Sequence, residues 1–217
     1  ARRLALKSSG SSPVEFRQGE VEDLPLEKTE WGSFDLAHAR FVLEHLTDPQ
    51  AAVEVMVNEV RPGGRVVLED DNHELLRLWP SCTAVDDLWR AYIETWQGLG
   101  NDPYVGRRLT TLLSRAGAKP RRSDMLFFGG SAGEASGAAC VSNFAGILEG
   151  ARQAIVDMTD WTQSRMDDAL AAFDEWSRQQ DAVLWYATCW AEGIRPGAGA
   201  EATSPNPSGL SESVPSG

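Results

Sequence analysis

The sequence is poor in cysteine and histidine, which occur three times each among 217 residues. An odd, widely spaced set of cysteines gives no disulfide framework and is typical of a reducing, cytoplasmic compartment. The histidines have no ligand spacing with the cysteines, so no zinc or other metal site is expected. The cysteines are Cys82, Cys140 and Cys189, and the histidines are His38, His45 and His73.

Long apolar runs and positive charge are also scarce. No run reaches the roughly 18 residues of a membrane helix, and no signal peptide is visible, so no membrane association is expected. The net charge is −12 and the pI about 4.7. A chain this acidic is poorly suited to a nucleic-acid backbone, which we exclude as its main partner.

Strand and helix patterns alternate in the first third of the chain. The segments 14–20, 34–39 and 65–70 have strand patterns, and 41–46 gives a short helical turn. The segment 48–60 predicts a helix that begins with Asp48 as N-cap and Pro49 at its first position. Such alternation is typical of an α/β fold with a mostly parallel sheet.

Helical patterns dominate after residue 73. The predicted helices are 74–100, with a break at Pro80, then 104–118, 138–158 and 162–180. The segments 123–130 and 182–193 have strand composition and are expected to pair as an antiparallel edge. The segment 196–217 has the composition of a disordered tail.

The stretch "RPGGRVVLEDDN" (61–72) places two glycines before a strand. Nucleotide-binding loops have their glycines after a strand, where the N–H groups of the next helix face the anion. We therefore interpret Gly63 and Gly64 as a turn with positive φ that follows a helix stopped by Pro62. Ligand chemistry is expected at the other end of the strand, near Asp70 and Asp71.

Several motifs occur in the order found in one enzyme family. They are "DLP" in an acidic turn, "FDL", "LEHL", an Asp-Pro helix start and "PGG". With these motifs the chain resembles the class I S-adenosylmethionine-dependent methyltransferases, in the branch with ubiquinone and menaquinone biosynthesis enzymes. The resemblance implies a Rossmann-like fold, S-adenosylmethionine as cofactor and a small-molecule methyl acceptor.

The resemblance also implies a cofactor site at the carboxyl ends of the strands. Glu20, Val21 and Glu22 would contact the adenine, with Glu20 in place of the usual aspartate. The methionine end would lie against Ala39, Arg40, Phe41 and His45. Glu20 and Glu22 can equally be loop acids, and His45 can be a packed helix residue.

The sequence departs from the family in one essential element. No strand followed by a Gly-x-Gly-x-Gly loop and an acidic ribose partner is found, and "FFGGSAGEASG" (127–137) lies far downstream. The expectation is therefore an N-terminally truncated domain that lacks the first two strands. On this interpretation 1–195 is a partial methyltransferase domain, with 1–72 as its cofactor side and 73–195 as helical lid and C-terminal strands. The strand 34–39 would keep an unpaired edge open to self-association.

Candidates for a catalytic base are His45, Asp71 and His73, with Asp70 beside them. Asp71-Asn72 resembles the magnesium ligands of catechol O-methyltransferases, but the further aspartate of those enzymes is replaced by Ala39-Arg40. The tryptophans between residues 79 and 96 can form a lid over an acceptor or pack in the core. Two other functions remain open: a non-catalytic interaction module, and a nicotinamide dehydrogenase, for which no Gly-rich fingerprint is present.

Overall fold

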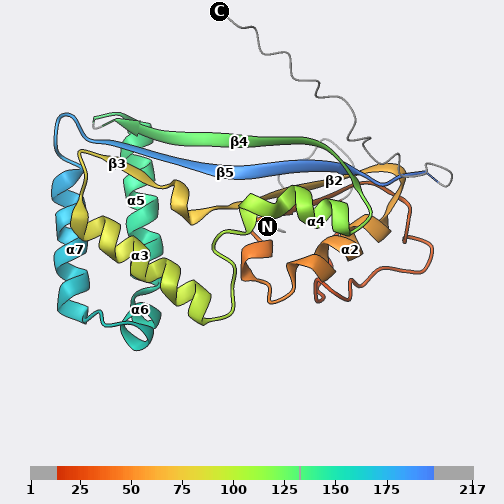
Figure 1. The fold of residues 1–217 in the computed structure, drawn as a ribbon, viewed down its shortest axis with the longest axis horizontal. Helices are drawn as coiled ribbons and strands as arrows, with labels where there is room; N and C mark the ends of the chain where they lie inside the picture. Colours follow the sequence, from red (N-terminus) through yellow and green to blue (C-terminus); the bar gives the residue numbers. More distant parts are fainter. Residues whose placement is uncertain (1–13, 132, 198–217) are drawn as a thin grey trace, which may run out of the picture.

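A computed structural model describes residues 14–131 and 133–197. Five strands form one sheet in the order β1-β2-β5-β3, and β4 also pairs with β5 (Figure 1). The strands are β1 (Phe34–Arg40), β2 (Val60–Asp71), β3 (Arg77–Trp79), β4 (Lys119–Ser131) and β5 (Val183–Ile194). The α/β fold class is confirmed.

The sheet is mixed, because β5 runs opposite to its neighbours. β1 and β2 are parallel, whereas β5 runs antiparallel to β2, β3 and β4. The described strands thus differ from the expected mostly parallel sheet. The predicted antiparallel pair of β4 and β5 is confirmed, but β5 lies inside the sheet and β4 lies at its edge.

The predicted strand 14–20 is wrong. The described residues before β1 contain only an isolated bridge between Glu20 and Asp23. An alternating pattern becomes a strand only when another strand accepts its hydrogen bonds, and Val14 stays 65% exposed. Among the described residues, nothing pairs with the outer edge of β1, on which Leu36 is 44% exposed.

The helix α2 (Pro49–Glu59) begins as predicted, because the Asp48 carboxylate accepts a hydrogen bond from the Ala51 N–H at 3.0 Å. It ends at Glu59, ahead of Pro62. Gly63 has the predicted positive φ, +79°, but its predicted place at the helix end is wrong, because Val60 caps α2 and both glycines lie within β2. The Gly63 N–H donates to the Arg195 carbonyl at 2.8 Å, so the glycine pair lies beside the end of β5.

The predicted helix 74–100 is wrong in its first part. Residues 73–79 form the 3-10 turn η2 (His73–Leu75) and β3, and α3 (Thr83–Gly98) follows. The later helices match the predicted segments, with the third segment divided in two. They are η3 (Val105–Arg108), α4 (Leu109–Arg115), α5 (Ala135–Gly150), α6 (Arg152–Met158) and α7 (Gln163–Trp176).

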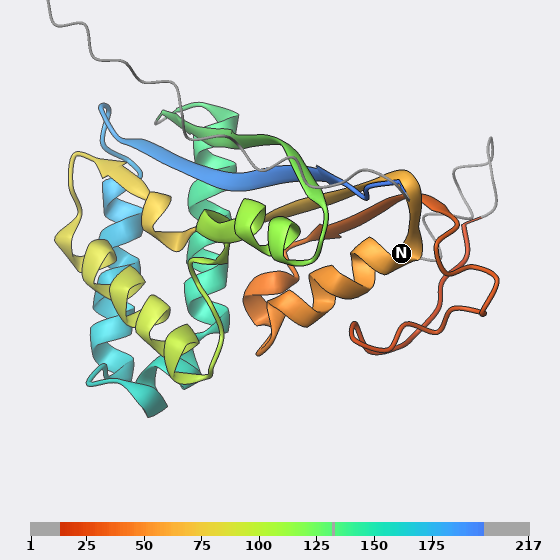
Figure 2. The ribbon, with the colours of Figure 1, turned by 45° about the vertical axis from the view of Figure 1, so that its right-hand side comes forward.

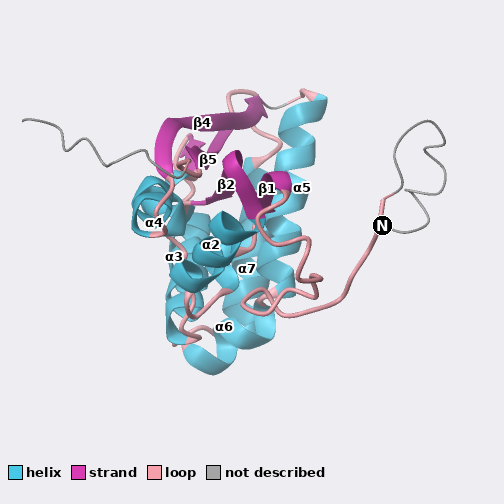
Figure 3. Ribbon diagram, turned by 90° about the vertical axis from the view of Figure 1, so that its right-hand side faces the viewer, coloured by secondary structure: helices cyan, strands magenta, loops and turns pink. Residues whose placement is uncertain are grey.

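β5 buries a different face at each of its ends. Leu184 and Tyr186 belong to a core with α3, α5, α6 and α7, whereas Cys189 and Ala191 belong to a second core with α2 and α4. Because side chains alternate along a strand, residues of even and odd number point to opposite faces. The two groups of helices accordingly cover opposite faces near opposite ends of the sheet (Figures 2 and 3).

None of the described helices is both long and apolar enough to cross a membrane. The predicted tail lies almost wholly outside the described residues.

Candidate functional site

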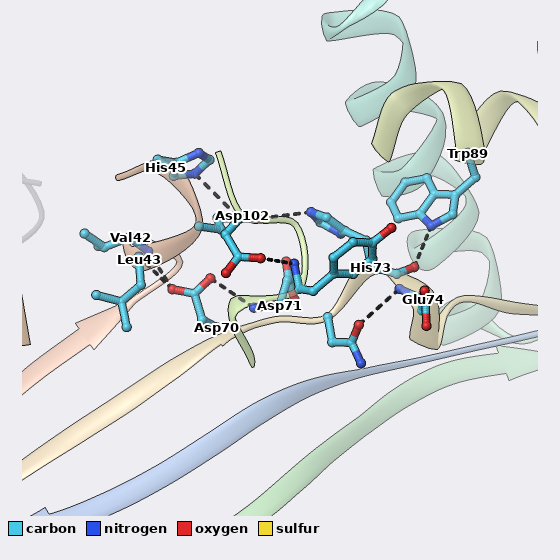
Figure 4. Close-up of polar contacts among 12 residues, drawn as sticks. Val42, Leu43, His45, Asp70, Asp71, His73, Glu74, Trp89 and Asp102 are labelled. Carbon is cyan, nitrogen blue, oxygen red and sulfur yellow. Dashed lines mark hydrogen bonds and ion pairs between the residues drawn. The ribbon is translucent and has the colours of Figure 1, made fainter. Parts of the chain in front are cut away.

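The carboxyl ends of β1 and β2 are joined through Asp70. Its carboxylate accepts hydrogen bonds from the N–H groups of Leu43 at 2.8 Å, Val42 at 3.1 Å and Asp71 at 3.0 Å (Figure 4). These bonds fix the 3-10 turn η1 (Leu43–His45) over the end of β2. Asp70 is fully buried and has a structural role, so it is removed from the candidate bases.

Glu44, His73 and Tyr186 form a buried hydrogen-bonded chain. The His73 Nε2 lies 2.9 Å from Glu44 Oε2, and its Nδ1 lies 3.0 Å from the Tyr186 hydroxyl. The three side chains come from η1, η2 and β5. A histidine with both ring nitrogens bonded is held in one orientation and can pass a proton between its partners.

The backbone of His73 is also fixed. Its carbonyl accepts a hydrogen bond from Trp89 Nε1 at 2.7 Å, and its N–H donates to the Pro103 carbonyl at 3.0 Å. The Trp89 ring meets the imidazole edge-on, with centroids 5.3 Å apart. The imidazole is therefore a rigid part of the site.

Asp71 lies beside this chain and has an unusual carboxyl group. Its Oδ1 is buried and has no hydrogen-bond partner among the described residues. Burial raises the pKa of Asp71 to about 7, with Glu44 and Asp70 adding to the rise and His73 opposing it. A carboxyl with this pKa can accept and release a proton near neutral pH.

Glu44, Asp71 and His73 each offer a ligand atom, and these atoms lie within 4.8 Å of one another. Such a group has the composition of a cation site. Both ring nitrogens of His73 are already bonded to Glu44 and Tyr186, so a metal ion would have to displace one of these partners.

This polar group opens into a cavity of about 340 Å³. Helix α3, helix α5, β4 and β5 supply mostly aromatic and apolar walls, and the ends of β1 and β2 supply the polar ones. The described lining residues are Phe41, Glu44, His45, Asp71, His73, Trp89, Tyr92, Phe128, Asn143, Phe144, Ile147 and Tyr186. A concave, mostly apolar pocket with a few convergent polar groups is the usual form of a small-molecule site.

Phe41 has φ +52° at the end of β1. A left-handed backbone is rare for a bulky residue, and strain of this kind collects at functional sites. Here the Phe41 N–H donates to the Glu69 carbonyl at 3.0 Å, and the ring lines the cavity.

The structure brings four of the predicted site residues to this cavity: Phe41, His45, Asp71 and His73. His45 lines it 3.5 Å from the Glu44 carboxylate, with its ring tilted by 47° to that of Trp96 at a centroid distance of 4.9 Å. The others do not line it. Arg40 pairs with Glu69 at 3.0 Å, Ala39 packs against the core, and Glu20, Val21 and Glu22 lie in the turn before β1.

Sequence reasoning missed Glu44 and Tyr186. Glu44 adjoins His45 in "LEHL", where helical spacing gave no sign that one of the two faces a buried histidine. Of the tryptophans between 79 and 96, Trp89 lines the cavity, while Trp79 is 62% exposed. The tryptophans thus contribute one wall residue and do not form a lid.

The Gly-rich segment 127–137 borders a second cavity, of about 370 Å³, between α5 and α7. A Cβ on Gly130 would lie 2.5 Å from the Gly137 N, and one on Gly137 would lie 2.4 Å from the Ser131 carbonyl oxygen. These glycines are therefore explained by the close packing of β4 against α5.

Part of the chain is similar to known methyltransferases. Residues 1–68 match the family model described as a methyltransferase domain. Over 66 residues the chain is 32% identical to a demethylmenaquinone methyltransferase of Paenarthrobacter aurescens, covering 30% of this chain and 25% of that protein. Over 72 residues it is 39% identical to a ubiquinone biosynthesis O-methyltransferase of Xanthomonas oryzae pv. oryzae, covering 33% of this chain and 28% of that protein.

The fold of the chain is similar to that of a solved structure. A crystal structure from Bacillus halodurans, whose name proposes a methyltransferase, aligns with 90% of this chain and 77% of its own at 13% identity and a TM-score of 0.52. The predicted resemblance is confirmed. The chain spans only about a quarter of the length of the curated relatives it matches.

Proposed function

Because its first 68 residues belong to a methyltransferase domain and its fold is that of such a protein, we propose that the whole protein transfers a methyl group from S-adenosylmethionine to a small molecule. The observation that supports this most is the cavity at the carboxyl ends of β1 and β2. Open α/β sheets bind their ligands at this edge.

The described residues of the cavity would contact only the methyl-bearing part of the cofactor. Phe41 and the polar group around His73 lie where β1 and β2 end, and these residues would border the methyl-bearing part. S-adenosylmethionine supplies an activated methyl group when it is bound. The residues of this chain would orient the acceptor, exclude water and take up a proton at Asp71 or His73.

No segment of the sequence has the strand and Gly-x-Gly-x-Gly loop that would hold the rest of the cofactor. We therefore expect this chain alone to bind S-adenosylmethionine with a dissociation constant of about a millimolar or weaker, equivalent to about −4 kcal/mol. Isothermal titration with S-adenosylmethionine and S-adenosylhomocysteine measures this directly. Micromolar binding would show that another segment replaces the loop.

Glu20 is expected to contact the cofactor in a protein that carries the Gly-rich loop. There, Glu20→Ala should weaken cofactor binding by about 1–3 kcal/mol, the cost of leaving a buried polar group unpaired. Glu27→Ala, in the same exposed loop, is the matched control. If the two variants bind equally well, Glu20 is a loop acid only.

The second candidate function is an interaction module, which the open edge of β1 favours. Its backbone groups have no partner among the described residues, and Phe34 and Leu36 are 36% and 44% exposed beside them. Such an edge is a template for pairing with another chain. We expect the chain to self-associate through β1.

Leu36→Lys should shift the chain toward the monomer, because a charged side chain on an edge strand opposes pairing. Sedimentation velocity of the wild type and the variant measures the change. Leu99→Lys is the control, since Leu99 is 54% exposed at the end of α3, away from β1. A wild-type chain that sediments as a monomer at every concentration contradicts the proposal.

A further inference from the structure

The lining of the 340 Å³ cavity has carboxylates but no opposing fixed cation. Glu44 and Asp71 both line it, and none of its described lining residues is lysine or arginine. Two arginines lie near this edge. Arg40 places its guanidinium 4.7 Å from the Phe41 ring centroid and pairs with Glu69 at 3.0 Å, and Arg107 is bonded to Asn72 at 3.1 Å and to Glu74. Glu44 and Asp71 therefore face no lysine or arginine across the described lining.

Aromatic rings surround these carboxylates. Trp89 and Tyr92 are stacked with centroids 4.9 Å apart, and Phe144 and Phe128 meet Tyr186 at 5.1 and 5.3 Å in edge-to-face geometry. The Phe41 ring at the end of β1 also lines the cavity, but it already has the Arg40 guanidinium 4.7 Å from its centroid. Aromatic faces attract cations, and rings arranged around a pocket are the usual recognition device for ammonium groups.

We propose that the cavity formed by Glu44, Asp71 and these rings takes a cationic amine, which is the methyl acceptor of the reaction. This substrate class rests on the proposed function. The carboxylates would attract the ammonium group, and the rings would surround the carbon atoms attached to it.

The tyrosines of the cavity show how its surroundings act on a phenol. Burial raises the pKa of Tyr92 and of Tyr186, and the charges of Glu44 and Asp71 raise both further. The same surroundings would hold an acceptor phenol in its protonated, weakly nucleophilic form. The same field stabilises an ammonium ion, so the cavity favours binding of an amine over binding of a phenolate.

An ammonium ion must lose a proton before its nitrogen can form a bond to carbon. The Asp71 carboxylate can accept that proton and leave a neutral amine with a free lone pair. The C–N bond then forms as the C–S bond of the cofactor breaks, so the sulfonium becomes a neutral thioether and the product carries the positive charge. The groups that face Asp71 are Glu44 of η1, Asp70 of β2, His73 of η2, and Tyr186 and Cys189 of β5.

Binding of small amines to this chain tests the proposal without the cofactor. Benzylamine and benzyl alcohol have nearly the same shape and differ in charge, and phenol represents the competing acceptor class. Tryptophan fluorescence reports binding, because Trp89 lines the cavity. One pH unit above the pKa of Asp71, we expect benzylamine to bind at least about tenfold more tightly than benzyl alcohol or phenol.

Two variants test whether the preference for benzylamine comes from Asp71 and Glu44 or from the overall negative charge of the protein. Asp71→Asn and Glu44→Gln should each remove most of the preference for benzylamine, because they weaken binding of benzylamine far more than binding of benzyl alcohol. Asp35→Asn, an exposed acid at the start of β1, is the charge-matched control and should bind like the wild type. For the wild type, the preference should decline as the pH falls through 7, because Asp71 then becomes protonated.

Near-UV circular dichroism of each variant shows whether it is folded. Equal binding of benzylamine and benzyl alcohol by the folded wild type overturns the proposal, and so does a preference that survives in both variants. Failure of the proposed function would appear differently. The chain would keep its preference for benzylamine, while the whole protein would fail to bind S-adenosylmethionine.

Discussion

Replacing Asp71 with asparagine is expected to stabilise the protein above pH 7. The folded-state pKa of Asp71 is about 7 because of burial, whereas an unfolded aspartate titrates near about 3.9. Between these values the folded state binds a proton that the unfolded state does not, so stability falls as the pH rises. A pKa difference of about three units, at about 1.4 kcal/mol per unit, limits the gain in the free energy of unfolding to about 4 kcal/mol. Because Asp71 keeps partial contact with solvent, we expect a gain of about 2 kcal/mol.

Urea unfolding of the wild type and of Asp71→Asn at pH 4 and pH 8 measures this difference. The two proteins should be similar at pH 4, where the wild-type carboxyl is protonated, and should diverge as the pH rises to 7 and above. Asp35→Asn removes an exposed carboxyl and should track the wild type. A constant difference between wild type and Asp71→Asn at both pH values would show that Asp71 has no raised pKa.

Replacing Asp70 with alanine is expected to destabilise the protein, in contrast to the replacement of Asp71. Its carboxylate accepts from three backbone N–H groups, of Val42, Leu43 and Asp71, and each buried donor left without a partner costs about 1–3 kcal/mol. Removing a buried carboxylate, whose pKa is itself raised by burial, offsets part of this cost. We expect a net loss of about 3 kcal/mol in the free energy of unfolding.

Asp70→Asn keeps one acceptor oxygen and should lose less than Asp70→Ala in the same urea titration. The alanine variant should also release η1, and with it the contact of Glu44 with His73, so binding in the cavity should weaken together with stability. An alanine variant within about 0.5 kcal/mol of the wild type would contradict the capping role, since surface substitutions give changes of that size.

The opposite signs expected for two adjacent aspartates follow from their partners. The oxygens of Asp70 meet backbone donors, whereas Asp71 Oδ1 is buried without a partner among the described residues. The Asp71 carboxyl also has a side-chain hydrogen bond with Tyr186, so only one of its oxygens stays unsatisfied in the described part of the chain. A buried carboxyl with a raised pKa is typical of a group kept for binding or proton transfer. This contrast is the reason to place the chemistry at Asp71 and the structural role at Asp70.

The sequence by itself determined the local elements whose causes lie within a few residues. Asp48 and Pro49 start α2, and Gly63 takes the positive φ that only a glycine adopts easily. The order of short motifs was enough to predict the methyltransferase resemblance, since those motifs lie in the matched residues 1–68. The expectation of ligand chemistry near Asp71, at the end of β2, stays a prediction.

Only the tertiary structure decided which residues form the site. Glu44, His73 and Tyr186 are up to 142 residues apart and meet because β5 runs antiparallel beside β2 and places its Tyr186 near the η2 turn. No local pattern records such a contact, because it depends on strand order. The same reason explains the failure of the predicted strand 14–20: an extended pattern requires a partner strand, and the described chain has none beside it.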